Sequence, residues 1–266
     1  MSFLKYLIPA SFLALLPTLS LAGSHCNNLD PGDAVGISFW IISISMVAAT
    51  VFFLMESLRV KGKWRTSLVV GALVTLVAGA HYFYMREIWA ATGESPTVFR
   101  YVDWIITVPL QMIEFYLILA ACTAVAGGVF WRLFLGSLVM LIGGYLGEAG
   151  FINATIGFVV GMAGWIFILY EIFAGEASKV SAESAPESVQ SAFNTMKWIV
   201  TIGWAIYPIG YFMGYMAGGA DANSLNFIYN IADVINKIAF CLAIWAAATT
   251  ESVSYTHLTL PTSYPV

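Results

Sequence analysis

The chain has 266 residues, of which 60% are hydrophobic and only 10% are charged, and its mean hydropathy is +0.83. About a quarter of the residues of a soluble domain are charged, so this composition excludes an ordinary soluble protein and indicates a polytopic membrane protein. The net charge of −4 comes without a basic patch or a charge run, which argues against nucleic-acid binding.

The sequence contains no motif for binding a nucleotide or a metal ion. It contains no GxxxxGK[ST] phosphate loop, so uphill work would need an energy source other than a nucleotide bound here. Cys26, Cys122 and Cys241 lack CxxC spacing. We interpret them as small apolar residues rather than as a disulfide framework or a set of metal ligands.

Residues 1–22 are predicted to be a cleaved signal peptide. Lys5 supplies a short positive start, an apolar run follows, and small residues precede Gly23 as at a cleavage site. The alternative is an uncleaved first membrane helix, although Pro9 and Pro17 interrupt the run.

Seven further apolar segments each have close to the roughly 20 residues that cross the hydrocarbon of a bilayer. They predict an all-α membrane protein, a bundle of seven transmembrane helices that forms one domain over residues 23–252. We expect a polar loop at about 176–189, and a non-native or disordered tail, 253–266, that does not continue the seventh helix. The segments are placed at about 35–57, 67–89, 98–121, 130–147, 153–174, 191–217 and 224–249.

The placement of lysine and arginine predicts the orientation of the bundle. Basic residues gather after the first segment and at the third and fifth connections, whereas acidic residues predominate on the other side. By the positive-inside rule, the N-terminus lies outside and the C-terminus is cytoplasmic. The cytoplasmic group is Arg59, Lys61, Lys63, Arg65, Arg132, Lys179 and Lys197, and the outer group is Arg86, Glu87, Glu94, Glu148 and Asp221.

The third segment carries charges that a simple membrane anchor would not. Asp103 and Glu114 are 11 residues apart, about three helical turns, so they share one face at a separation of about 16 Å. Arg100 precedes Asp103 by three residues and Thr107 follows it by four, so both are neighbours on that face. Ionised groups in hydrocarbon are costly and mark functional sites. The stripe is therefore typical of a proton path.

The seventh segment places Asp233 and Lys237 at positions i and i+4 of one helical face. From this segment alone, two interpretations stay open. The two residues form a structural ion pair, or the lysine amine forms a Schiff base with an aldehyde, a role that suits a buried lysine. Helical side chains lean toward the N-terminus, so we expect the Lys237 tip at the level of Asp233 and Asp103, with Glu114 on the cytoplasmic side.

Bulky side chains on three other segments would suit a flat apolar ligand beside that lysine. Taken alone they are ordinary packing residues, and only the reactive lysine favours a polyene aldehyde. His81, midway along the second segment, is either a satisfied core histidine or a partner that adjusts the proton affinity of Asp103. The candidate ligand-binding residues are Trp104, Met140, Trp204, Tyr207 and Pro208.

The motifs around these residues resemble the microbial rhodopsin family, most closely the proteorhodopsins. The resemblance extends from about Val35 to Glu251 and is dense in FRYVDWIITVPL, which begins at Phe99. It continues through EFYLILAA from Glu114, GGYLGEAG from Gly143, VQSAFNT from Val189, GWAIYP from Gly203, and Asn236-Lys237.

The resemblance implies all-trans retinal bound to Lys237 as a protonated Schiff base that light isomerises. It implies Asp103 as counterion and proton acceptor, Asp233 as second counterion, Arg100 on the release side and Glu114 as proton donor.

Three positions distinguish the kinds of pump within that family. Asp103, Thr107 and Glu114 match the proton pumps, whereas chloride pumps lack the first acid and sodium pumps carry Asn, Asp and Gln. Photosensory members usually lack the donor carboxylate, so Glu114 argues against a sensor.

The resemblance also assigns roles to three further side chains. Gln111 occupies the colour-tuning position, where glutamine is similar to the blue-absorbing subgroup; the alternative is an inert polar residue. His81 matches the histidine that partners the counterion. Trp40 matches a residue that contacts this histidine across the subunit boundary of a ring-shaped homo-oligomer, a pentamer or hexamer.

We therefore predict a light-driven outward proton pump of a bacterial inner membrane, a transporter rather than an enzyme, with blue absorption. Its partners would be the lipid bilayer, the transported proton and other copies of the chain. One alternative is a photosensor with a slow photocycle that signals through a partner protein. A second is a retinal-free seven-helix transporter or receptor in which Asp233 and Lys237 are a structural pair.

Overall fold

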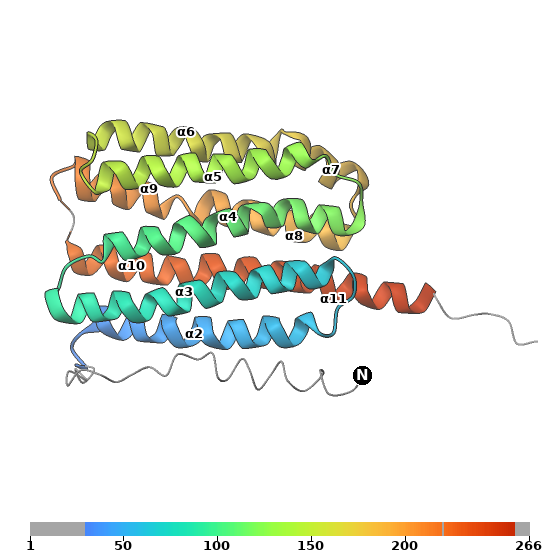
Figure 1. Ribbon diagram of the computed structural model, residues 1–266, viewed down its shortest axis with the longest axis horizontal. Coiled ribbons are helices and arrows are strands. Elements are labelled where there is room, and N and C mark those ends of the chain that lie inside the picture. The colour runs from blue at the N-terminus through green and yellow to red at the C-terminus, as the bar shows by residue number, and fades with distance from the viewer. Residues whose placement is uncertain (1–29, 220, 259–266) are drawn as a thin grey trace, which may run out of the picture. The chain divides into compact units, whose positions relative to one another are not determined.

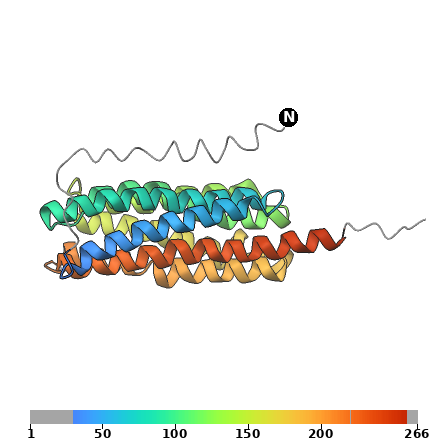
Figure 2. The same cartoon turned by 90° about the horizontal axis from the view of Figure 1, so that it is seen from below.

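The computed structural model describes residues 30–219 and 221–258, and the predicted signal peptide, 1–22, lies outside the described residues. From Pro31 onward the described residues belong to one compact unit. Within this described part, seven helical spans are long and apolar enough to cross a membrane, and Figure 1 and Figure 2 show them side by side. The predicted all-α seven-helix bundle is confirmed.

Each of the first four spans is a single α-helix, the fifth joins two α-helices, and the last two contain π-helical segments. Here the sixth span is Glu187–Met216 and the seventh span is Ala222–Ser252. In the described residues, π-helical segments lie at Ile199–Gly203, Phe212–Met216 and Ile235–Ala239. The α-helices are α2 (Ala34–Ser57), α3 (Trp64–Thr92), α4 (Thr97–Cys122), α5 (Gly127–Glu148), α6 (Ala154–Phe173), α7 (Glu176–Ser184), α8 (Glu187–Trp198), α9 (Ile206–Tyr211), α10 (Ala222–Val234) and α11 (Phe240–Leu258).

Local sequence signals set the ends of several helices. The Asp33 carboxylate accepts a hydrogen bond from the Gly36 N–H at 2.8 Å and so caps α2. Asn153 caps α6 in the same way, through the N–H of Thr155 at 2.9 Å. Helix α3 ends at Gly93, whose φ of 68° lies in the left-handed region that glycine adopts without strain.

Helices α5 and α6 pack closely because small residues line their contact. A Cβ at Gly157 would lie 2.6 Å from the Cα of Gly147, and one at Gly164 would lie 2.6 Å from the backbone nitrogen of Met140. Small residues at a helix interface let backbones approach and gain van der Waals contact, which supports association of helices in a bilayer. The pair forms one wall of the cavity described below.

The expected polar loop at about 176–189 is wrong in part, because it contains α7 and the first turn of α8. The segment has no proline or glycine between Glu176 and Ala185, so a short helix can form before Pro186 interrupts it. Buried Glu171 fixes its start: one carboxylate oxygen accepts the N–H of Ala177 at 3.0 Å.

An ion-pair cluster ties this start to α5. Arg132 binds Glu171 at 2.8 Å and Glu176 at 2.7 Å. The planar guanidinium can bind two carboxylates at once, which fixes their geometry.

The expectation that the seventh helix ends before Val253 is also wrong, because α11 continues to Leu258. The first helix-breaking residue after Ser252 is Pro261, so nothing in the intervening sequence forces an earlier end. Residues 259–266 lie outside the described residues, and the nature of this tail stays a prediction.

Candidate functional site

Three ionisable side chains from α4 and the seventh span meet in the interior of the bundle. The Nζ of Lys237 lies 3.0 Å from Oδ2 of Asp103 and 3.0 Å from Oδ2 of Asp233. All three side chains are at most 2% exposed. An ammonium this deeply buried requires compensating charge. The expected meeting of the Lys237 tip with both carboxylates is confirmed.

The seventh span presents these groups through a polar stripe along its inner face. Asn226, Asn230, Asp233 and Lys237 are spaced by four, three and four residues, which is the period of one helical face. All four side chains are buried. Lys237 itself lies in the π-helical segment Ile235–Ala239, a kind of interruption that is frequent at functional sites.

The two carboxylates differ in their hydrogen bonding. Asp233 accepts from the hydroxyl of Tyr82 at 2.7 Å, from the Tyr207 hydroxyl, and from Nε1 of Trp104 at 3.4 Å. Asp103 binds Lys237 through Oδ2, while its Oδ1 has no hydrogen-bond partner among the described residues. Asp233 is therefore saturated as an acceptor, and Asp103 keeps a free oxygen on which a proton can bind.

Thr107 and Arg100 lie on the same face of α4 as Asp103, as predicted. The Thr107 hydroxyl donates to the backbone carbonyl of Asp103 at 3.0 Å, one turn earlier on the helix, and not to the Asp103 carboxylate. Arg100 is 2% exposed. Its guanidinium donates to Oδ1 of Asn226 and Oδ1 of Asn230, both at 2.7 Å.

Several polar residues of this network were not among the predicted site residues. They are Tyr82, Asn226 and Asn230, which hold Asp233 and Arg100. The asparagines could have been found by extending the helical period backward from Lys237. Tyr82 gives no such signal, because one tyrosine in an apolar helix is common packing.

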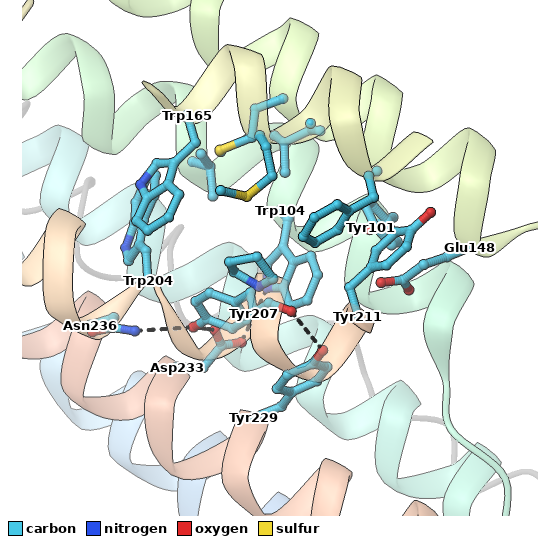
Figure 3. Close-up of a pocket in the computed structure, with 18 of the residues that line it drawn as sticks. Tyr101, Trp104, Glu148, Trp165, Trp204, Tyr207, Tyr211, Tyr229, Asp233 and Asn236 are labelled. Atoms are coloured by element: carbon cyan, nitrogen blue, oxygen red, sulfur yellow. Dashed lines mark hydrogen bonds between the residues drawn. The ribbon is translucent and has the colours of Figure 1, made fainter. Parts of the chain in front are cut away.

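A cavity opens from Lys237 between α4, α5, α6 and the sixth span, with ≈ 800 Å³ of empty space including its open mouth. All the predicted ligand-binding residues line it: Trp104, Gln111, Met140, Trp204, Tyr207 and Pro208. Figure 3 shows Trp165 and Trp204 together at one end of the cavity, and Tyr211 and Glu148 at the other. Trp165 and Glu148 were not predicted.

The cavity fits a long, flat, apolar group joined to the lysine. Its walls are mainly aromatic rings and methionines, and Trp104 and Tyr207 meet edge to face with ring centroids 5.0 Å apart. Beside Lys237, Asp103 and Asp233 would balance a cationic nitrogen. These are the properties that retinal attached to Lys237 would require.

Glu114 lies on the same helix in very different surroundings. It is 1% exposed, and neither carboxyl oxygen has a hydrogen-bond partner within the part of the chain that the structure describes. The hydroxyl of Ser67 and the thiol of Cys241 lie near it. The next residue, Phe115, packs against Phe193 of α8 with centroids 5.0 Å apart. An unpaired carboxylate is so costly in such a place that the neutral acid is favoured.

The remaining predicted residues lie farther from Lys237 or at the bundle surface. Gln111 lines the cavity, and its Nε2 donates to the backbone carbonyl of Asn236 at 3.1 Å. His81 is half-buried on α3, with its Nδ1 2.9 Å from the carbonyl of Val77. Trp40 is 36% exposed on α2 and lies beneath the guanidinium of Arg86. The expected roles of these three residues stay predictions.

Comparison with known proteins identifies the family. Residues 33–251 match the family of bacteriorhodopsin-like proteins. The green-light absorbing proteorhodopsin of Gamma-proteobacterium EBAC31A08 is 51% identical over 94% of this chain and 99% of its own length. The blue-light absorbing proteorhodopsin of Gamma-proteobacterium Hot 75m4 is 52% identical over 93% and 98%.

A crystal structure agrees with these sequence comparisons. The blue light-absorbing proteorhodopsin from Med12 is 55% identical, with a TM-score of 0.71 over 82% of this chain and 100% of that one. Green-absorbing and blue-absorbing relatives are similar to nearly the same degree, so their names do not decide the colour of this protein. The chain is thus a multi-pass membrane protein that belongs to the bacteriorhodopsin-like family of microbial rhodopsins, as predicted, and lies close to the proteorhodopsins.

Proposed function

We propose that the protein is a light-driven proton pump that moves protons outward across a bacterial inner membrane, with retinal bound covalently at Lys237. The observation that carries this proposal is the contact of Lys237 Nζ with Asp103 and Asp233, together with a separate buried acid, Glu114, that lies farther along α4 and has no hydrogen-bond partner among the described residues. Bound retinal would supply absorption of visible light and a light-driven change of shape. The protein would supply the path of the proton.

The acceptor step follows from the contrast between the two aspartates. The proton on Lys237 Nζ would move to Asp103, which lies 3.0 Å away and has one oxygen without a hydrogen bond among the described residues. Asp233 would remain ionised, because Tyr82, Tyr207 and Trp104 donate to it and stabilise its charged form. Arg100 donates to the Tyr82 hydroxyl, which in turn donates to Asp233, and would guide release of the proton on the outer side.

The donor step would use Glu114. As a neutral acid it holds a second proton, which would replace the one that Lys237 Nζ has lost to Asp103, and Glu114 would then be reprotonated from the cytoplasm. One proton then leaves outward through Asp103 and one enters through Glu114 in each cycle, so the net transfer is one proton. Direction would arise because the two acids lie on opposite sides of the nitrogen along α4.

Orientation, assembly and colour complete the proposal. The lysine and arginine distribution supports an outside N-terminus and a cytoplasmic C-terminus. Trp40, at the surface near α3, supports a ring-shaped homo-oligomer in which a neighbouring subunit reaches His81. Gln111 supports blue absorption, because its amide dipole lies in the cavity wall and is fixed by the Asn236 carbonyl.

The direct test is light-driven acidification by cells that express the protein with added retinal. In a lightly buffered suspension, illumination should lower the external pH, and an uncoupler should abolish the change. Coloured cells with no pH change, measured where Asp103 is ionised, would contradict the pump and favour a photosensor. Colourless cells with confirmed expression would contradict retinal binding at Lys237 and favour the retinal-free alternative.

A further inference from the structure

The sixth span contains an interruption at the level of the cavity. In the π-helical segment Ile199–Gly203, the N–H of Trp204 donates to the carbonyl of Ile199, five residues earlier, at 3.2 Å. A turn at Trp204 and Ala205 follows before α9 begins. Such interruptions of the hydrogen-bond ladder are points at which a helix bends.

Side chains from two neighbouring elements bind backbone carbonyls of this π-helical segment. Nε1 of Trp165, on α6, donates to the carbonyl of Val200 at 3.1 Å. Nδ2 of Asn236, on the seventh span, donates to the carbonyl of Gly203 at 3.0 Å. Val200 is fully buried and Asn236 is 3% exposed, so these bonds satisfy carbonyls that water does not reach readily.

Asn236 has a special position because it precedes Lys237 in the other π-helical segment, Ile235–Ala239. Its side chain binds Gly203 and, at 3.3 Å, the Tyr207 hydroxyl, which Figure 3 shows as a dashed line. Its backbone carbonyl accepts from Gln111 on α4. A Cβ at Gly203 would overlap the Asn236 Oδ1, so the two residues are in close contact. Because Asn236 is bonded to Lys237, a displacement of Lys237 would alter the contact between Asn236 and Gly203.

The part of the sixth span that precedes this bend, α8, packs against the residue next to the donor acid. Helix α8 places Phe193 against Phe115, the residue next to Glu114, and Phe240 of α11 packs on the other side of Phe115 with centroids 5.8 Å apart. Separation of Phe193 from Phe115 would loosen the packing beside Glu114. A swing of α8 about Ile199–Gly203 would separate them while leaving the cavity walls of α9 in place.

We infer that Asn236 is a positioning residue that latches the sixth span to the segment bearing Lys237, so that movement of Lys237 releases α8 and admits water to Glu114. The inference rests on the proposed function and deepens it, since it names the side chain that links the lysine to the refilling of the donor. Trp165 holds the same π-helical segment from α6 and limits the motion to a bend.

Backbone hydrogen–deuterium exchange of the purified retinal-bound protein in lipid nanodiscs tests the latch in the dark. Asn236→Leu has nearly the same volume but cannot donate to Gly203 or Tyr207. It should accelerate exchange across Glu187–Gly203 by about three- to tenfold, the range expected for losing one net hydrogen bond. Exchange in α3 should not change. In the unsubstituted protein, continuous light should produce a similar acceleration.

Gly203→Ala provides an independent variant, because it retains Asn236 but displaces its amide and should give the same acceleration. Asn194→Leu, the same substitution at an exposed residue of α8, is the matched control and should not accelerate exchange. Unchanged exchange over Glu187–Gly203 in both Asn236→Leu and Gly203→Ala would overturn the latch. If Asn236→Leu fails to fold, Gly203→Ala alone decides. Absence of light-driven acidification would refute the pump and leave the dark exchange pattern intact, so the two failures are distinguishable.

Discussion

The two acids of α4 lie on one helix and in opposite chemical surroundings. Asp103 is within 3.0 Å of an ammonium, in a network that contains Asp233, Arg100 and Tyr82. Glu114 has no ion pair and no hydrogen bond to either oxygen in the described part of the chain, and the residue next to it, Phe115, packs against aromatic rings. Charged partners favour an ionised carboxylate, and an apolar site favours a neutral one.

This difference explains how one helix can both accept and donate a proton. The acid that is ionised at rest can only accept, and the acid that is neutral at rest can only donate. Directional proton transfer therefore needs no moving proton carrier larger than the Lys237 side chain, provided that the surroundings of Asp103 and Glu114 remain different.

Removing the lysine should have the largest effect. Lys237→Ala should abolish covalent retinal and leave the buried Asp103 and Asp233 without a cation, which also destabilises the fold. Denatured protein should carry no bound chromophore by absorption spectroscopy. Lys179→Ala, an exposed lysine on α7, is the control and should bind retinal normally. Chromophore retained on Lys237→Ala after denaturation would contradict the attachment site.

Neutralising Asp103, the acid that is ionised at rest, should remove the proton acceptor. Asp103→Asn should stop acidification and shift absorption to longer wavelength, because the cationic nitrogen loses the charge 3.0 Å away. Light-driven pH change and the absorption spectrum measure the two effects. Asp221→Asn, at the exposed start of α10, should affect neither. Pumping that persists in Asp103→Asn would exclude Asp103 as the acceptor.

Replacing Glu114, the acid that is neutral at rest, tests the proton donor. Glu114→Gln keeps the shape but has no acidic proton, so return of the proton to Lys237 Nζ should slow by roughly 100-fold. Flash spectroscopy measures this rate, and added azide, a small diffusible proton donor, should restore part of it. Glu183→Gln on the exposed face of α7 is the control. An unchanged rate in Glu114→Gln would mean that the proton returns by another route.

A smaller effect is expected from the cavity wall between the two acids. Gln111→Leu removes an amide dipole beside the bound chromophore and should shift absorption to longer wavelength without stopping proton transport. Gln190→Leu on α8 is the same change at a residue outside the cavity lining, whose side-chain amide donates to the Ala185 carbonyl, and it should not shift the spectrum. A spectrum unaltered by Gln111→Leu would make Gln111 an inert polar residue.

The smallest expected effect is on stability and comes from Asp221, an exposed carboxylate that contrasts with the buried Asp103 and Glu114. Hydrogen bonds from the N–H and hydroxyl of Ser224 lower the pKa of Asp221 below its usual value. Since the folded pKa is below the unfolded one, this cap stabilises α10 above the unfolded pKa and is lost as pH falls through the folded pKa. Asp221→Asn should flatten the loss of thermal stability as the pH falls below about 5, through the unfolded pKa of about 3.9 and the lower folded pKa. An equally steep loss would exclude this contribution.

Much of the fold and the centre of the site could be predicted because the bilayer simplifies both. Apolar length fixes the spans, and a charge in such a span stands out, as Lys237, Asp103 and Glu114 do. The helix at Glu176–Ser184 was missed because tertiary contacts of Glu171 and Arg132 stabilise its start. The π-helical segments were missed because no single residue type causes them. The bond from Asn236 to Gly203 is likewise visible only once two distant helices are placed together.

The most direct test of the account is infrared difference spectroscopy of the purified pigment, comparing the unsubstituted protein with Asp103→Asn and Glu114→Gln. The account predicts that light creates a protonated carboxyl band that is lost in Asp103→Asn. It also predicts that light later bleaches a band, already present in the dark, that is lost in Glu114→Gln. A dark band assigned to Asp103, or no dark band from Glu114, would contradict the difference between the two acids on which the proposed direction of pumping depends.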